Sequence, residues 1–249
     1  MDFKPEYQTE SFEKVDLYIL ARLDEIIELC NNSFDRLDFL SATSALMTFM
    51  STDLSSFYLD ISKDILYCEK ANSLRRRQVQ TVLYRIGEAL LRILNPILPF
   101  TMDELNKNLP GERKWNAQLL DYPHPSMDKK EREELLQGYD ELLAFRTNVL
   151  KNLEEARNNQ VIGSSQQALV KMARNGKYAP LMNKHGLVSL AKACVVSEIK
   201  LVDELEDDQI KVIHHPGKFC ERCWNFEDDA IEQSDGTYLC KRCQEVVGK

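Results

Sequence analysis

Residues 79–94 read Val79-Gln-Thr-Val-Leu-Tyr-Arg-Ile-Gly-Glu-Ala-Leu-Leu-Arg-Ile-Leu94, which is the clearest helical pattern in the chain. Apolar side chains recur at steps of three and four residues, so they share one face of an α-helix. Pro96 and Pro99 follow and are expected to end the helix, because proline lacks a backbone N–H and clashes with the preceding turn. This continuous apolar stripe predicts a helix at the centre of a bundle.

Two further apolar stripes precede this helix and predict its neighbours. One helix is expected over about residues 15–30, ending at Asn31-Asn-Ser-Phe, and another over about residues 37–61. Asp53 lies on the apolar stripe of the second of these helices. A carboxylate beside a core usually has a hydrogen bond or an ion pair, so we favour a structural role for Asp53 over a functional one.

After the central helix the pattern predicts a short helix and then a loop. Thr101 with Glu104 three residues on fits a capping box, which would begin the short helix at Thr101, and Phe100 would pack as part of a hydrophobic staple. The stretch 110–126 contains three prolines and an isolated Trp115. We expect it to be a long ordered loop lying over the bundle.

The periodicity changes in the second half of the chain. A densely charged helix is predicted from Asp128 to about residue 158. Strand-like segments at 168–173, 193–202 and 209–213 then surround a helix-like segment at 179–190. These segments together predict a small α/β unit.

Two Cys-x-x-Cys pairs, Cys220/Cys223 and Cys240/Cys243, lie near the end of the sequence. The two-residue gap lets one tight turn direct both sulfurs of a pair at a single point. Between the pairs, the run Ser234-Asp-Gly-Thr-Tyr-Leu predicts a turn and a short strand that bring the second pair to the first. Four thiolates arranged in this way favour one structural zinc ion.

Three other interpretations of the cysteines compete with zinc. Disulfides need an oxidising compartment, and the first residues show no charged and apolar leader, so we expect a cytoplasmic chain. A thioredoxin-like redox site would need a single pair beside a strand and a helix. Spacing alone does not separate zinc from a four-cysteine iron site.

The remaining cysteines and the nearby histidines are not expected to bind the metal. His214 and His215 precede the first pair, but four cysteines already complete a structural site, so we expect both histidines to face solvent at a strand end. Cys30, Cys68 and Cys194 occur singly in apolar stretches and are expected to be small buried thiols.

Together these patterns predict a mainly α fold with three parts. A helical bundle would occupy residues 1–126, a long helix and a small α/β junction residues 127–213, and a four-cysteine zinc knuckle or ribbon residues 214–249.

Composition and charge restrict the functions that fit. The 249 residues are 43% hydrophobic and 29% charged, and no apolar run is long enough to span a membrane. The net charge of −8 argues against non-specific coating of nucleic acid. None of the four histidines has a recognisable catalytic partner, and neither a phosphate-binding loop nor a Gly-x-Gly-x-x-Gly motif is present. The chain alone is therefore expected to be catalytically inactive.

Local cationic residues are the exception to the acidic balance. The stretch 69–92 has six positive residues against two negative ones, which marks either a solvated helix face or a phosphate-binding face. The knuckle loops carry Lys218, Arg222, Lys241 and Arg242. These four can offset the double negative charge of a zinc ion with four thiolates, contact phosphates, or do both.

Several motifs resemble those of a known enzyme family. The run Ser51-Thr-Asp-Leu-Ser-Ser-Phe-Tyr-Leu-Asp, the segment Arg76-Arg-Gln-Val-Gln-Thr-Val-Leu-Tyr and the segment Pro96-Ile-Leu-Pro-Phe-Thr-Met-Asp-Glu are similar to the anticodon-binding helical domain of class I aminoacyl-tRNA synthetases for branched aliphatic amino acids. The Ile162-Gly-Ser-Ser run and the Cys220-Glu-Arg-Cys-Trp motif narrow the resemblance to the C-terminal part of bacterial isoleucyl-tRNA synthetases. The resemblance covers nearly the whole chain.

The resemblance implies a function in tRNA binding. The bundle would position the anticodon stem-loop of isoleucine tRNA, and the four cysteines would match the family's C-terminal zinc ligands. Isoleucine activation with ATP would belong to a catalytic domain, which has no counterpart in this sequence, as the editing domain has none. The tRNA-binding side chains that we predict are Arg75, Arg76, Arg77, Arg85, Arg222, Lys241 and Arg242. The alternative is a zinc-stapled helical protein-interaction module without tRNA specificity.

Overall fold

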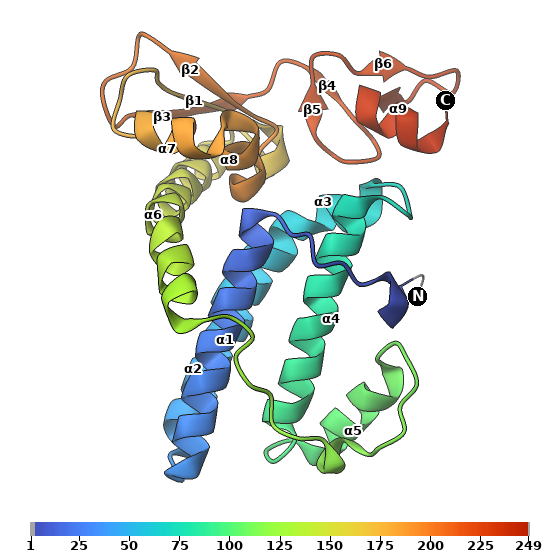
Figure 1. Cartoon of the computed structure of the whole chain (residues 1–249). Helices are drawn as coiled ribbons and strands as arrows, with labels where there is room; N and C mark the ends of the chain where they lie inside the picture. Colours follow the sequence, from blue (N-terminus) through green and yellow to red (C-terminus); the bar gives the residue numbers. More distant parts are fainter. Residues whose placement is uncertain (1–2, 249) are drawn as a thin grey trace. The chain divides into compact units, whose positions relative to one another are not determined.

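The structure is a computed structural model that describes residues 3–248. Residues 1, 2 and 249, which the predicted first and last domains include, lie outside this range. The fold is mainly helical, as predicted (Figure 1). The chain divides between Gly138 and Tyr139 into two compact units, each with its own buried core. Among the described residues, no helix is long and apolar enough to cross a membrane.

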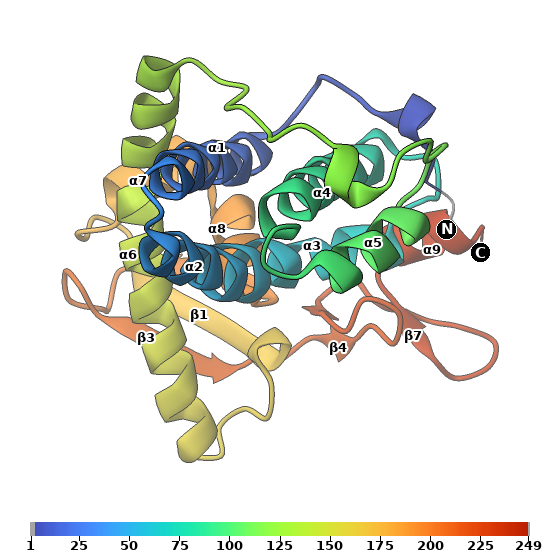
Figure 2. The same ribbon diagram turned by 90° about the horizontal axis from the view of Figure 1, so that it is seen from below.

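The first unit is a helical bundle in which α1 packs against α2 and α4, and α5 packs at an angle against α4 (Figure 2). The predicted central helix is α4, and its residues Val79 and Val82 are completely buried, with Ile86 almost so. The α4 helix packs against α1, α3 and α5. The elements of this unit are η1 (Pro5–Tyr7), α1 (Lys14–Asp35), α2 (Phe39–Thr48), η2 (Phe49–Leu59), α3 (Asp60–Cys68), α4 (Leu74–Leu94), α5 (Pro99–Asn108), η3 (Ala117–Leu119) and the start of α6 (Lys129–Asn158).

The helices before α4 are longer than predicted. The α1 helix continues through Asn31 to Asp35, because Ser33 is buried and the Asn31 amide donates a hydrogen bond to the Pro123 carbonyl oxygen. The second predicted helix runs without a break through α2, η2 and α3 and ends at Cys68. Its middle section, η2, is a π-helix, in which backbone bonds join residues five apart.

Two expectations about single residues had opposite outcomes. The structural role of Asp53 is confirmed, since its carboxylate accepts hydrogen bonds from Arg22 at 3.2 and 3.3 Å. The capping box is wrong, because α5 begins at Pro99 and Phe100 is 90% exposed. Proline suits the first turn of a helix and drives the preceding residue out of the α conformation, so it sets the start before Thr101 can.

The loop after α5 is ordered against the bundle, as predicted. Ala117 packs with Leu91 and Met102, and the buried Asn106 amide donates a hydrogen bond to the Trp115 carbonyl oxygen.

The second unit contains the rest of α6, a three-stranded sheet and two small hairpins. In the sheet, β1 is central and pairs in parallel with β2 and antiparallel with β3. The predicted helix at 179–190 is two helices, because Gly186 adopts a left-handed φ of 76° between them. The elements are η4 (Ser165–Gln167), β1 (Ala168–Ala173), α7 (Ala179–His185), α8 (Leu187–Cys194), β2 (Glu198–Val202), β3 (Ile210–His214), β4 (Lys218–Phe219), β5 (Phe226–Glu227), β6 (Ile231–Glu232), β7 (Tyr238–Leu239) and α9 (Lys241–Val247).

The last segment, residues 216–248, forms the predicted knuckle, and we call it the zinc knuckle. The β4 and β5 strands form its first hairpin, and β6 and β7 form the second. Gly236 occupies the turn of the second hairpin with φ 83°, a conformation that favours glycine. The Asp-Gly turn therefore brings the second cysteine pair back to the first, as the sequence predicts.

Candidate zinc centre and cationic residues

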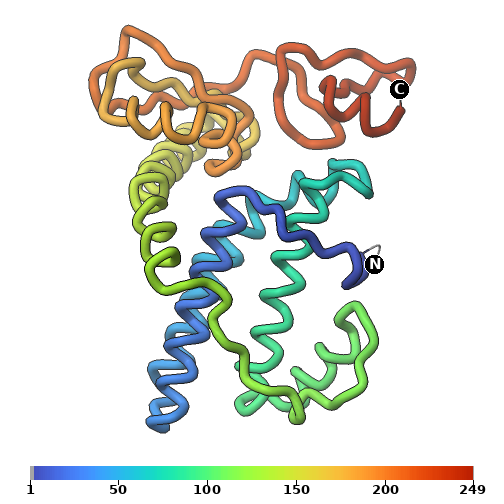
Figure 3. Tube along the Cα trace, viewed as in Figure 1, coloured from blue at the N-terminus to red at the C-terminus, as the bar shows by residue number. Residues whose placement is uncertain are grey.

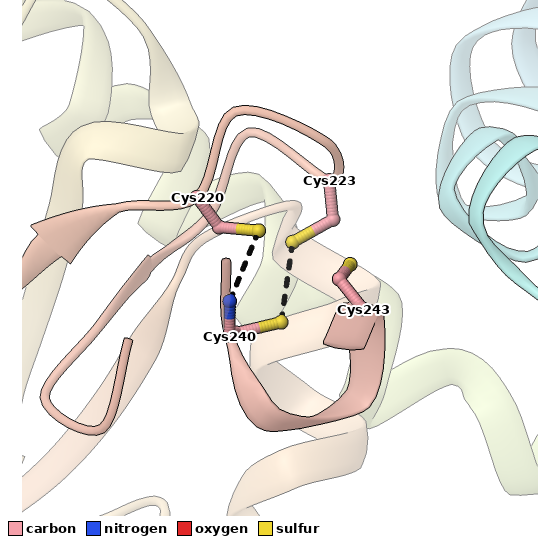
Figure 4. Close-up of side chains that lie close together, drawn as sticks. All are labelled: Cys220, Cys223, Cys240 and Cys243. Carbon is pink, nitrogen blue, oxygen red and sulfur yellow. Dashed lines mark hydrogen bonds between the residues drawn. The ribbon is translucent and has the colours of Figure 1, made fainter. Parts of the chain in front are cut away.

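Each cysteine pair is held by a different local structure. Cys220 directly follows β4, and the chain turns tightly so that the Trp224 amide donates a hydrogen bond to the Cys220 carbonyl oxygen. Trp224 takes a left-handed φ of 65°, which closes this turn. Cys240 occupies the position just before α9, and Cys243 lies in the first turn of that helix. Figure 4 shows the four side chains directed at one another from these two segments.

The four sulfurs form a compact, buried cage. All of them lie within 4.8 Å of one another. The Cys223 and Cys240 sulfurs are 3.8 Å apart, and the Cys240 amide donates to the Cys220 sulfur at 3.3 Å. A tetrahedral zinc ion with Zn–S bonds of about 2.3 Å places its sulfurs about 3.8 Å apart. The cage therefore fits zinc in donor type, number and spacing.

The electrostatics of the cage favour a bound cation. Burial, with the neighbouring thiolates as a further cause, raises the pKa of Cys223 to about 12. Burial also raises the pKa of Cys220, but backbone N–H donors outweigh it and lower the value to about 7. One thiolate thus forms readily, whereas several together repel one another without a central positive charge. A divalent ion removes that repulsion, as in structural zinc sites.

The expectation that both histidines face solvent is wrong for His215. His214 is exposed, but His215 is only 2% exposed and forms a hydrogen bond with Glu198 at 3.1 Å. Its other ring nitrogen accepts a hydrogen bond from the Gly217 amide at 3.0 Å. His215 lies outside the sulfur cage and instead joins the sheet to the start of the zinc knuckle.

A second contact joins the zinc knuckle to the sheet, and no pattern in the sequence predicts it. The Phe226 amide donates a hydrogen bond to the Ser197 hydroxyl at 2.7 Å, while that hydroxyl donates to the Gln166 carbonyl oxygen. The Phe226 ring also packs edge-on against His214. The zinc knuckle is therefore anchored by contacts at both of the strands that flank β1.

The cations of the zinc knuckle lie around the cage. Lys218 and Lys241 are exposed, and Arg222 and Arg242 are half-buried. The Lys218 ammonium group sits over the Tyr238 ring at 5.5 Å from its centre. The positive charge of Arg242 lies close enough to Glu227 to oppose the rise in the pKa of that carboxyl, which burial causes.

The predicted cations of α4 are already in contact with other parts of the bundle. The Arg75 guanidinium pairs with the buried carboxylate of Asp16 at 2.5 Å. Arg76 donates hydrogen bonds to two backbone carbonyl oxygens, those of Leu66 and Ala71.

Residues 3–13, which we call the lead-in segment, lie across α4 (Figure 3). Its Tyr7 ring stacks under Arg77 at 4.6 Å. Its Glu10 carboxylate pairs with Arg85 at 2.6 Å. A ligand that approached this face would therefore compete with the lead-in segment for Arg77 and Arg85.

Comparison with known proteins agrees with the fold and the cage. The anticodon-binding domain of tRNA ligase matches residues 16–172, and the zinc finger found in FPG and IleRS matches residues 217–246. The two matches place a tRNA-ligase anticodon-binding domain and an IleRS-type zinc finger in one chain. The chain belongs to the family of tRNA-ligase anticodon-binding domains.

Relatives at the level of whole proteins are isoleucine–tRNA ligases. The chain is 36% identical to the ligase of Staphylococcus carnosus (strain TM300) over 255 residues and 36% identical to that of Staphylococcus aureus (strain MSSA476) over 257 residues. Each alignment covers 99% of this chain but 28% of the relative. These matches do not favour the alternative of an interaction module without tRNA specificity.

Proposed function

We propose that this chain is the tRNA-binding portion of an isoleucine–tRNA ligase. Its bundle would hold the anticodon stem-loop of isoleucine tRNA, and its zinc knuckle would add contacts or brace the bound RNA. The observation that carries the proposal is the match of almost the whole chain to isoleucine–tRNA ligases, with both the bundle and the cage in place.

The chemistry of the ligase would lie outside this chain. Because the chain spans 28% of the length of the relatives, ATP binding and isoleucine activation are assigned to a separate catalytic part, which would be its second partner. The chain by itself is expected to lack ligase activity. A cytoplasmic location follows from the same assignment, since the substrate would be tRNA.

Each of the three predicted parts of the chain would have its own function. Residues 1–126 would bind the anticodon stem-loop, residues 127–213 would form the junction, and residues 214–249 would hold zinc through Cys220, Cys223, Cys240 and Cys243. The buried cage and its 3.8 Å sulfur spacing support these four as the ligands.

The predicted tRNA contacts differ in how strongly other residues of the chain already engage their charges. Arg85, Arg222, Lys241 and Arg242 are exposed or half-buried and could reach phosphates. Arg75 is held by Asp16 and Glu13, so a phosphate would have to share its guanidinium. Lysine and arginine side chains position RNA through phosphate contacts, whereas splayed loop bases supply sequence specificity.

A filter-binding titration tests the proposal. Zinc-loaded chain is titrated with isoleucine tRNA and with an unrelated tRNA over a range of salt concentrations. We expect tighter binding to isoleucine tRNA and weaker binding of both at high salt. Equal binding of both tRNAs at every salt concentration would contradict the proposal and favour the interaction module.

A further inference from the structure

Three lysines lie next to one another across the sheet of the second unit. Lys171 in β1 is directly opposite Lys200 in β2 and also directly opposite Lys211 in β3. Residues opposite each other on neighbouring strands point to the same face. Since strands lie about 4.8 Å apart, the three positions span about 10 Å. We call Lys171, Lys200 and Lys211 the lysine row.

The lysine row reaches solvent on one face of the sheet, although Leu169 and Ala173 on the same face of β1 are buried and Lys171 is half-buried. The neighbouring positions Val170, Met172 and Ile199 point to the other face and are at most 3% exposed. The α8 helix packs on β2, and Figure 1 shows α7 and α8 together below the sheet. By contrast, the Lys200 side chain is 41% exposed and Lys211 is exposed.

The fold does not explain this concentration of charge. Like charges directly opposite each other destabilise a sheet. Lys200 is compensated, because its ammonium nitrogen lies 2.9 Å from Glu198 and 3.7 Å from Asp228. Within residues 3–248, the ammonium groups of Lys171 and Lys211 have no hydrogen bond or ion pair. An anion from outside the chain would remove the repulsion between them.

We propose that the lysine row binds the phosphate backbone of RNA, as a second contact surface for the tRNA of the proposed function, on which this inference rests. Lysine presents a compact charge on a flexible stem, which suits phosphate contacts that carry no sequence information. The row adjoins the zinc knuckle, because Asp228 of the zinc knuckle is the residue that approaches Lys200. One RNA strand could therefore follow both.

The surroundings of the row favour RNA over an acidic protein. Protein interfaces usually contain a core of apolar and aromatic side chains. In the described part of the chain, β1, β2 and β3 carry no exposed large apolar side chain. The face offers charge without an apolar anchor, which is the character of a surface for the RNA backbone.

The test compares two double variants in the full chain. Lys171→Gln with Lys211→Gln removes the two unpaired charges of the row. Lys151→Gln with Lys192→Gln is the matched control, because both of those lysines are exposed and lie on helices, not on the strands of the row. For each protein, binding of isoleucine tRNA is measured against salt concentration, and thermal unfolding is measured in parallel.

We expect the row variant to lower the slope of log affinity against log salt by about 1.4 to 1.8, since each lost phosphate contact contributes about 0.7 to 0.9. Its unfolding temperature should be unchanged or higher, because repulsion is relieved. The control should change the slope by less than half as much. Normal tRNA binding with an unchanged slope in the row variant would overturn the inference and leave an acidic protein as the occupant. No tRNA binding by the unaltered chain would instead overturn the proposed function.

Discussion

The guanidinium of Arg75 and the carboxylate of Asp16 form a two-point ion pair, with nitrogen–oxygen distances of 2.5 and 3.1 Å. Asp16 is completely buried and also accepts a hydrogen bond from the Tyr58 hydroxyl at 2.7 Å. Burial and the Asp16 charge raise the pKa of Tyr58, so its hydroxyl stays a neutral donor. The pair fixes α4 to α1 inside the bundle, which makes Arg75 a structural residue whatever it also does with RNA.

Replacing Arg75 should therefore destabilise the bundle. Arg75→Gln leaves the buried Asp16 carboxylate without its cation, and breaking such pairs costs about 3 to 5 kcal/mol. Urea unfolding followed by circular dichroism measures the change. The double variant Asp16→Asn with Arg75→Gln should lose less than the two single variants added together. Arg77→Gln is the control, and a loss of stability equal to that of Arg75→Gln would contradict the assignment.

The contact between Glu10 and Arg85 gives a prediction about tRNA affinity. Glu10 is 83% exposed in this pair, so Glu10→Gln should leave the free energy of unfolding nearly unchanged. It should strengthen tRNA binding at low salt, because the carboxylate no longer competes with phosphate for Arg85. The filter-binding titration checks both tRNA affinity and its salt dependence. Glu6→Gln removes the same charge from a residue that pairs with Lys4, and it should have a smaller effect on affinity.

The features that depend on short-range patterns could be predicted from the sequence. The α4 stripe and the two Cys-x-x-Cys pairs each repeat one residue type at a fixed spacing, so the helix and the cage follow from local geometry. The role of Asp53 followed from the cost of placing an unpaired carboxylate beside a core. No long-range information was needed for any of these.

The features that could not be predicted depend mostly on residues far apart in the chain. His215 can be buried because its ring forms a hydrogen bond with Glu198, at the start of β2. No local pattern in the sequence indicates that pairing. The lysine row exists only through the register of β1 with β2 and β3, which the separate strand patterns did not reveal. The start of α5 failed for a different reason, since two local signals competed and Pro99 overrode Thr101.

Zinc removal should separate the seven cysteines into two groups. Burial raises the pKa of Cys30 to about 11 and that of Cys194 to about 12, so at pH 8 these thiols remain protonated and unreactive. With zinc bound, the four cage cysteines are also protected. We expect a chelator to make four thiols reactive towards an aromatic disulfide reagent in the native chain, leaving three slow. Seven fast thiols after chelation would mean that the loss of metal unfolds the whole chain, and no change would mean that the cage holds no metal.

Gly217 tests whether the zinc knuckle is anchored independently of the metal. A Cβ atom at this position would lie 2.7 Å from the backbone of Glu227, which is inside the zinc knuckle, and 2.9 Å from the His215 ring. Gly217→Ala therefore opens the first hairpin and displaces the contact with His215. Hydrogen exchange should become faster at the Phe226 amide, which loses its bond to Ser197, while zinc content stays at one ion per chain. Gly236→Ala is the control.

At Gly236 a Cβ atom meets nothing within 4 Å, and the cost is limited to the strain of a left-handed φ. Exchange at Phe226 should therefore stay slow in that variant. If Gly217→Ala also kept slow exchange at Phe226, the anchor would not depend on this close approach. If Gly217→Ala lost zinc instead, the anchoring of the zinc knuckle and the binding of the metal would depend on each other. Such coupling is physically reasonable, because β4 leads directly into Cys220.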